Sequence, residues 1–357
     1  MSHYEKSLQA DLERIRAGVL DVAESVESNL EAALRALLST DSDLAYATIL
    51  RDHPINRAVE EVDSSCHRFV VRHLPSAGHL RFISAVLRMN IELERIGDYA
   101  ETICQEVTTL TGPLEGQFRR EVERMGKDAL DMYRSAIESF TSQNAEKARA
   151  TKSAAKSIER DFHVAYEQLA SEGEEGVGTT RDRFSKLVVL SMLERVSDQA
   201  KNLCEEVVWA LTGERKKRRP MKVLFIDRAN TVFAPLAVAA GRKSHPKSGV
   251  YDMAAANPAA QISEEVSRFL STSGHEVSEL VPSRIDWPVE SWGNFDIIVS
   301  FEGSYADYVD NVPFNTVALN WAVGNATDSV DDLYRNILSH VVELMDMVRG
   351  REVEYES

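Results

Sequence analysis

A segment of fourteen residues occurs twice in this chain, at a constant offset of 100 positions. Residues 94–107 read Glu-Arg-Ile-Gly-Asp-Tyr-Ala-Glu-Thr-Ile-Cys-Gln-Glu-Val, residues 194–207 read Glu-Arg-Val-Ser-Asp-Gln-Ala-Lys-Asn-Leu-Cys-Glu-Glu-Val, and seven positions are identical. Apolar residues around both copies recur at spacings of three and four, as amphipathic helices require. Such a repeat on a helical background predicts two units in tandem that share one fold.

Breaks rich in Gly, Pro and Asp divide the N-terminal part into segments of helical length. We predict six helices, at residues 4–39, 43–72, 78–110, 115–141, 144–171 and 179–211. Helices of this length in a globular protein pack sideways against each other. The N-terminal part is therefore expected to be all-α, with two three-helix bundles in tandem.

The basic run Arg-Lys-Lys-Arg-Arg at 215–219, followed by Pro220, marks the end of the helical part. Like charges repel along such a run, and proline cannot continue a helix. We predict four segments: a domain of two three-helix repeats at 1–213, a basic linker at 214–220, an α/β domain at 221–350 and an acidic tail at 351–357.

Short apolar runs alternate with helical segments after the linker. Strands are predicted at 223–226 and near 249–253, 296–300 and 316–319, and helices from Pro235 and at 261–273, 303–309 and 328–349. This alternation implies a parallel four-stranded sheet that is covered on both faces.

Charge and hydropathy exclude several classes of function. The chain has 41 basic and 57 acidic residues, a net charge of −16, which disfavours binding to nucleic acids because neutralising phosphates needs clustered Lys and Arg. There is no apolar run of membrane-spanning length and no secretion signal at the start. The three cysteines, Cys66, Cys104 and Cys204, are too few for a disulfide framework. We therefore expect a cytoplasmic protein.

The repeated segment carries a pair of acids that suggests metal binding. Glu94 and Asp98 are four residues apart and project from one helix face, and Glu194 with Asp198 repeats this geometry. Neighbouring carboxylates repel each other unless a cation lies between them. Facing helices can supply further oxygen ligands, and Asp52 is a candidate. We predict these five acids as metal ligands; the alternative is that they form ion pairs with basic side chains or face water.

The stretch Leu-Glu-Arg-Ile-Gly-Asp-Tyr-Ala at 93–100, its counterpart at 193–200 and the two three-helix units resemble the PhoU family over residues 5–213. The resemblance implies a cytoplasmic regulator of bacterial phosphate uptake and phosphate-responsive signalling, whose E(D)-x-x-x-D motifs bind iron or zinc-type ions. It implies negative regulation, by protein contact, of the phosphate-specific ABC transporter ATPase and of a sensor histidine kinase. The protein would reach the membrane only through these partners, and we expect a homodimer.

Both repeats depart from the family pattern. Asn56 stands where an acid is common, and His79 replaces the usual Asp before the third helix. In the second repeat the matching positions are Ala155 and Glu159, which leaves one acid missing. Each repeat therefore has a reduced set of ligands.

Residues 223–237, Val-Leu-Phe-Ile-Asp-Arg-Ala-Asn-Thr-Val-Phe-Ala-Pro-Leu-Ala, and the strand at 296–300 resemble the low-molecular-weight protein tyrosine phosphatase and arsenate reductase fold. That family needs a cysteine nucleophile, an arginine that closes the loop and a late aspartic acid. Here Asp227, Phe233 and Asn325 take those places. We therefore expect an inactive phosphatase-like domain that serves partner binding or dimerisation.

Three functions remain in competition. We favour a regulatory adaptor without enzymatic activity, in which a metal-binding helical domain is joined to the inactive phosphatase-like domain. The alternatives are a phosphatase or arsenate reductase, and a helical scaffold that binds no metal.

Overall fold

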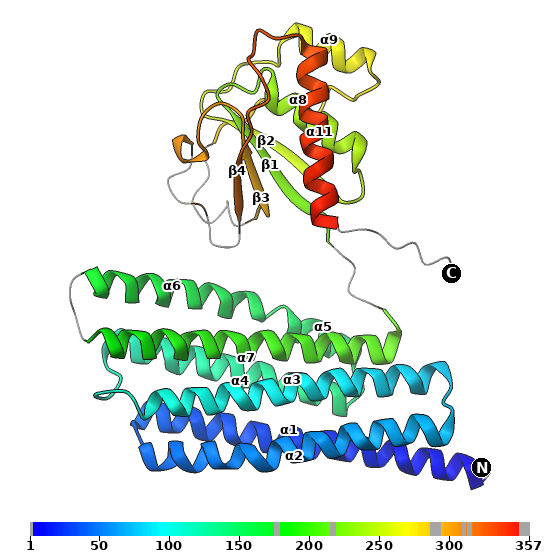
Figure 1. Cartoon of the computed structure of the whole chain (residues 1–357), viewed down its shortest axis with the longest axis vertical. Coiled ribbons are helices and arrows are strands. Elements are labelled where there is room, and N and C mark those ends of the chain that lie inside the picture. Colours follow the sequence, from blue (N-terminus) through cyan, green and yellow to red (C-terminus); the bar gives the residue numbers. More distant parts are fainter. Residues whose placement is uncertain are drawn as a thin grey trace. The chain divides into compact units, whose positions relative to one another are not determined.

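The computed structural model describes residues 3–174, 179–214, 219–285, 294–308, 312 and 316–349. The chain divides into two compact units, residues 1–216 and 217–357, and each has its own apolar core (Figure 1). Most of the predicted basic linker and the predicted acidic tail lie outside the described residues. None of the helices in the described ranges combines the length and the apolar character that a bilayer crossing needs.

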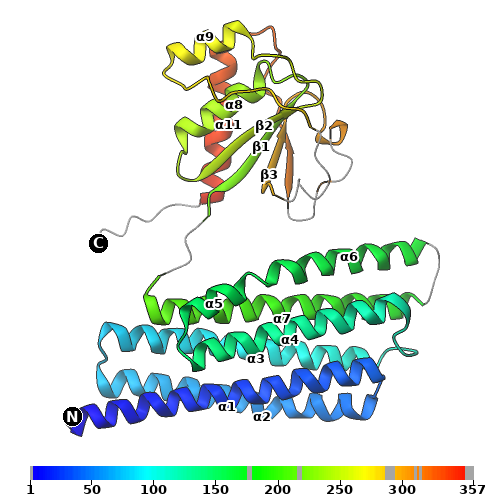
Figure 2. The same cartoon turned by 180° about the vertical axis from the view of Figure 1, so that it is seen from behind.

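Long helices lie side by side in the helical unit (Figure 1). They are α1 His3–Ser39, α2 Ser42–His73, α3 Ala77–Val107, α4 Gly116–Thr141, α5 Ala145–Lys152, α6 Ala155–Glu174 and α7 Thr180–Thr212. Helices α1 and α2 pack on α3, while α4, α5 and α6 pack on α7, and α3 packs on α7 (Figure 2). The two repeated segments therefore lie at the centre of the unit, where Leu93, Ile96, Leu193 and Val196 are fully buried.

The single helix predicted at 144–171 is wrong, because the chain divides there into α5 and α6. The hydroxyl of Ser153 donates to the Ala150 carbonyl at 2.7 Å, and that of Ser157 donates to the Ala154 carbonyl at 2.8 Å. Such side-chain bonds compete with the helical backbone pattern. The backbone N–H groups of Ser153 and Ala154 accordingly bond to carbonyls three residues back. The other five predicted helices are confirmed, with ends within three residues.

The second unit contains the predicted parallel four-stranded sheet. Its strands are β1 Met221–Asp227, β2 Gly249–Ala255, β3 Ile297–Ser300 and β4 Val317–Asn320, in the order β2-β1-β3-β4. All neighbouring strands are parallel. Asp227 of β1 pairs in register with Ala255 at the carboxyl end of the sheet, so the loop after β1 begins at that edge.

Helices cover one face of this sheet and loop residues cover the other. The helices are α8 Phe233–Ser244, α9 Glu264–Thr272 and α11 Val330–Arg349, and α8 and α11 pack over Val223 and Phe225. Leu224 and Ile226 face the opposite side, where Phe295, Tyr305 and Tyr308 are among the residues packed on them. The helix predicted at 303–309 is a short 3-10 helix, η1 Tyr305–Asp307.

Candidate metal centre

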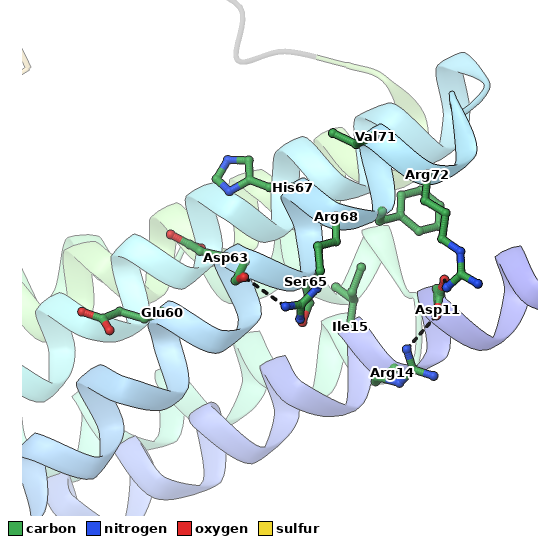
Figure 3. Close-up of a pocket in the computed structure, with 12 residues that line it drawn as sticks. Asp11, Arg14, Ile15, Glu60, Asp63, Ser65, His67, Arg68, Val71 and Arg72 are labelled. Carbon is green, nitrogen blue, oxygen red and sulfur yellow. Dashed lines mark hydrogen bonds and ion pairs between the residues drawn. The ribbon is translucent and has the colours of Figure 1, made fainter.

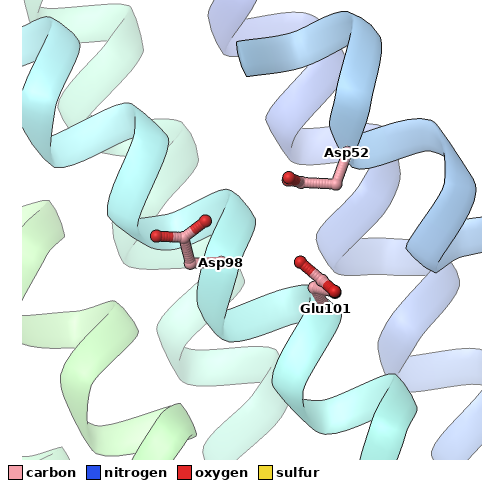
Figure 4. Close-up of side chains that lie close together, drawn as sticks. All are labelled: Asp52, Asp98 and Glu101. Atoms are coloured by element: carbon pink, nitrogen blue, oxygen red, sulfur yellow. The ribbon is translucent and has the colours of Figure 1, made fainter.

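Three acidic side chains meet between α2 and α3 (Figure 4). Asp52 reaches from α2 toward Asp98 and Glu101 of α3, and one carboxylate oxygen of each lies within 4.8 Å of the others. Asp98 and Glu101 share a helix face because they are three residues apart. Asp52 is only 3% exposed, Glu101 is half-buried and Asp98 is exposed. The cluster is thus buried on the α2 side and open on the α3 side.

One oxygen of Asp52 lacks a hydrogen-bond donor. Its Oδ2 accepts from Nδ2 of Asn56 at 2.7 Å, whereas the buried Oδ1 has no hydrogen-bond partner. A buried acceptor without a partner costs about 1–3 kcal/mol. Gly97 makes room for this oxygen, since a Cβ there would lie 3.0 Å from Asp52 Oδ1. A cation bound by the carboxylates would satisfy that atom.

Burial and mutual repulsion oppose ionisation of these acids. Burial raises the pKa of Asp52, and the nearby Glu101 charge raises it further, while the hydrogen bond from Asn56 opposes the shift. Burial also raises the pKa of Asp98, and repulsion from Asp52 raises it further. A cation between the carboxylates would reverse this balance, and an all-oxygen donor set suits hard or borderline metal ions. The residues present therefore fit a metal ion.

Two of the five predicted ligands, Asp52 and Asp98, belong to this cluster. Glu94 lies one turn before Asp98 and outside the group of three. Burial raises the pKa of Glu94, and Asp98, Asp63 and Asp52 raise it further. Glu94 therefore adds negative charge beside the cluster.

The third member of the cluster, Glu101, was not predicted. The predicted ligands on α3 and α7 are acids that the two repeats share, and position 101 is one at which the repeats differ. Its spacing of three residues from Asp98 placed it on the same helix face. That spacing was the signal that could have found it.

The second repeat has different neighbours around its acids. Lys201 occupies the position that matches Glu101, and its Nζ lies 3.0 Å from Oδ1 of Asp198. Burial raises the pKa of Glu194, and the charges of Asp198 and Glu159 raise it further. The charges of Arg195 and Lys201 oppose the increase. Within the described part of the chain, no three acids of this repeat bring carboxylate oxygens within 4.8 Å of one another. Asp198 thus takes part in the ion pairing considered as the alternative to metal binding.

A groove of about 770 Å³ runs along α1 and α2 (Figure 3). Asp11 pairs with Arg14 at 2.7 Å and with Arg72 at 3.2 Å. Arg68 donates to the hydroxyls of Ser64 and Ser65. The three arginines that line the groove therefore bind groups of the protein itself, and the groove is less suited to a ligand than the acidic cluster.

The three residues predicted in place of phosphatase-like catalytic groups lie in different surroundings in the α/β unit. Asp227 ends β1, and Phe233 begins α8 with its ring in the apolar core. Asn325 is exposed in a turn, where its backbone N–H donates to Asp328 at 2.7 Å. Asp227 therefore lies at the start of a loop, Phe233 in the apolar core and Asn325 in an exposed turn.

Comparison with known proteins identifies both repeats. Residues 19–107 and 122–207 match the PhoU domain. The chain is 29% identical over 235 residues to a Pseudomonas putida protein named phosphate-specific transport system accessory protein PhoU homolog, an alignment that covers 65% of this chain and 91% of that protein. The crystal structure of PhoU from Pseudomonas aeruginosa superposes with a TM-score of 0.56 at 28% identity, over 58% of this chain and 99% of that one.

The structural neighbours of the C-terminal part include a thioredoxin-dependent arsenate reductase from Corynebacterium glutamicum. Its TM-score is 0.32 at 20% identity, over 38% of this chain and 64% of that chain. This likeness is too slight to support a function.

Proposed function

Because both repeats match the PhoU domain, the helical unit belongs to the PhoU family, and we propose that this chain is a regulatory accessory protein of a phosphate-specific transport system. The observation that carries the proposal is the pair of PhoU domains at 19–107 and 122–207. The name of the Pseudomonas putida relative supports it, as does the superposition on PhoU from Pseudomonas aeruginosa.

The regulation is negative and works by contact with other proteins. The partners are the ATPase of the phosphate ABC transporter and a phosphate-responsive sensor histidine kinase, and the protein acts in the cytoplasm as a homodimer. The α/β unit contributes no catalysis, because Asp227 stands where the phosphatase-like fold would need a cysteine. It serves instead as a further surface for protein contact.

Asp52, Asp98 and Glu101 form the primary metal site in this proposal, and the ion is of the iron or zinc type. The unpartnered Oδ1 of Asp52 and the space beside Gly97 support this assignment. Glu94 strengthens the site through its charge or as an additional ligand. Glu194 and Asp198 form a weaker second site, because Lys201 competes with a cation for Asp198.

A metal ion in the primary site would tie α2 to α3, since its ligands come from both helices. Metal binding of this kind stabilises the folded arrangement of the elements that supply the ligands. A partner that binds the metal-bound arrangement of α2 and α3 better than the metal-free one would then respond to metal occupancy. In this way the acidic cluster links a bound ion to protein contact.

The experiment measures phosphate uptake in phosphate-rich medium after deletion of the gene. We expect uptake to rise on deletion and to return to its original level when the wild-type chain is supplied. A chain with Asp52→Asn, Asp98→Asn and Glu101→Gln should restore regulation only in part. The matched control, Glu194→Gln with Asp198→Asn, should restore most of it.

Two outcomes separate the parts of this proposal. Uptake that is unchanged by deletion would contradict the role in phosphate transport. Full restoration by the chain altered at Asp52, Asp98 and Glu101 would leave that role standing and would contradict the role of the metal site.

A further inference from the structure

The loop between β1 and α8, residues 227–234, surrounds a buried carboxylate. Asp227 is 1% exposed, and its Oδ1 accepts hydrogen bonds from the backbone N–H groups of Ala229 at 3.2 Å and Asn230 at 2.6 Å. The side-chain amide of Asn230 donates to the same oxygen at 3.1 Å. Oδ2 accepts from the backbone N–H of Ala234, in the first turn of α8, at 3.0 Å.

These four contacts are the kind that proteins use to hold anions. Successive backbone N–H groups in a turn, together with the N-terminus of a helix, attract negative charge. All four contacts donate to Asp227, so they favour its ionised form. Burial raises the pKa of Asp227, whereas the N–H groups of Ala234, Asn230 and Ala229 oppose that shift. The loop therefore compensates the carboxylate in part for the water that it lacks, and the pKa of Asp227 stays above its ordinary value.

A second carboxylate of the chain binds the neighbouring donor. The backbone N–H of Arg228 donates to Oε2 of Glu302, just after β3, at 3.0 Å. Glu302 also raises the pKa of Asp227 by repulsion. Acidic groups of the protein itself thus bind donors along the loop from Arg228 to Ala234, and an incoming anion would meet their charge.

Asn230 fixes the shape of the loop around Asp227. Its backbone adopts a positive φ of 52°, a conformation in which asparagine is among the favoured residues after glycine. Its buried side chain donates both to Asp227 and to the carbonyl of Ala254 on β2, at 3.1 Å each. The turn is therefore attached to the sheet at the place where the carboxylate is held.

We infer that the Asp227 carboxylate is a permanent internal ligand of the β1–α8 loop and occupies the place where this loop would otherwise hold a free oxyanion such as inorganic phosphate. The α/β unit keeps donors of an anion-binding loop, but four of them bind the Asp227 side chain and a fifth binds Glu302. The inference concerns this loop alone and does not depend on the role in transport.

The test uses the full chain with Asp227→Ala, with Asp227→Asn and, as a matched control, with Asp252→Asn on the exposed side of β2. Titration calorimetry with inorganic phosphate should detect millimolar or tighter binding only for Asp227→Ala, which removes the internal ligand and leaves the donors. Wild type and Asp252→Asn should give no such signal. Phosphate that binds wild type as well as Asp227→Ala, or a folded Asp227→Ala chain that binds none, would overturn the inference.

The second measurement does not require Asp227→Ala to fold. Asp227→Asn preserves the size of the side chain but presents an amide to N–H donors, so amide hydrogen exchange at residues 229, 230 and 234 should become at least tenfold faster. Asp252→Asn should leave exchange at those amides unchanged. Equal protection in wild type and Asp227→Asn would show that the carboxylate is not the ligand of the loop.

Discussion

Helices α3 and α7 carry the same Glu-x-x-x-Asp dyad at the same register, but different residues surround it. In the first repeat Asp98 faces Asp52 and Glu101, so negative charge accumulates between two helices. In the second repeat Lys201 forms an ion pair with Asp198. The repeated motif is therefore the same, whereas the residue beside its Asp is an acid in the first repeat and a base in the second.

The difference teaches that a duplicated motif does not duplicate a site. The dyad alone places two carboxylates on one helix face, which is common at protein surfaces. A third acid on that face and a buried acid from the neighbouring helix are what make the first repeat, and not the second, the proposed cation site. Position 101, an acid in one repeat and a base at the matching position of the other, is the main point of difference.

The largest effect is expected from Glu101→Lys, which gives the first repeat the charge pattern of the second. The new lysine should pair with Asp98 as Lys201 pairs with Asp198. The substitution changes the charge beside the metal by two units. The interaction of one pair of unit charges at about 4 Å is already worth roughly 4 kcal/mol at an effective dielectric constant of ~20, so metal affinity should fall by at least about 1000-fold. Competition with a chromophoric chelator measures the metal affinity. If the affinity of Glu101→Lys stays within tenfold of wild type, the residue at position 101 does not explain the difference between the repeats.

Removal of the metal should destabilise the helical unit. An ion present at 100 times its dissociation constant contributes about 2.7 kcal/mol to the free energy of unfolding. For a unit of this size, we expect addition of a chelator to lower the melting temperature by roughly 5–10 °C. Calorimetry measures the shift. The chain with Asp52→Asn, Asp98→Asn and Glu101→Gln should melt at one temperature with or without chelator, and an equal shift in that chain would refute the assignment.

Gly97 offers a smaller test of the same contrast. A Cβ at this position would lie 3.0 Å from Asp52 Oδ1, so Gly97→Ala should displace the carboxylate and weaken metal binding about tenfold. The matched position in the second repeat is Ser197, and Ser197→Ala should change the affinity less than twofold. Isothermal titration with the metal measures both. Equal effects of the two substitutions would mean that the repeats do not differ at this position.

The smallest effect is a dependence of stability on pH in the metal-free protein. Because burial raises the pKa of Asp52 in the folded state, the ionised side chain destabilises the fold at neutral pH. This penalty shrinks as the pH falls below the folded pKa and is gone below the ordinary value of 3.8. Asp52→Asn should therefore be more stable than wild type at pH 7. Urea unfolding should show that the difference in free energy of unfolding between Asp52→Asn and wild type decreases toward pH 4. A difference that does not change with pH would contradict the raised pKa of Asp52.

Much of the fold could be predicted because its signals are local. Apolar periodicity and breaks located five helices, and alternation located the parallel strands. The break at Ser153 was missed because no Gly or Pro marks it, and the competing hydroxyl bonds depend on the folded backbone.

The candidate site was predicted only in part. Asp52 and Asp98 were found from motif and resemblance, whereas the approach of Asp52 to Glu101 depends on how α2 packs on α3. The sequence also singles out Asp227, and its place at a nucleophile position stays a prediction. Its four hydrogen bonds could not be predicted, because they require the positive φ of Asn230.

The most direct test of the account is the metal content of the full chain, measured by elemental analysis after purification without chelator. The account predicts bound metal in wild type and in the chain with Glu194→Gln and Asp198→Asn, and its loss in the chain with Asp52→Asn, Asp98→Asn and Glu101→Gln. Metal retained by the last of these, or lost equally from both altered chains, would contradict the claim that the first repeat holds the ion.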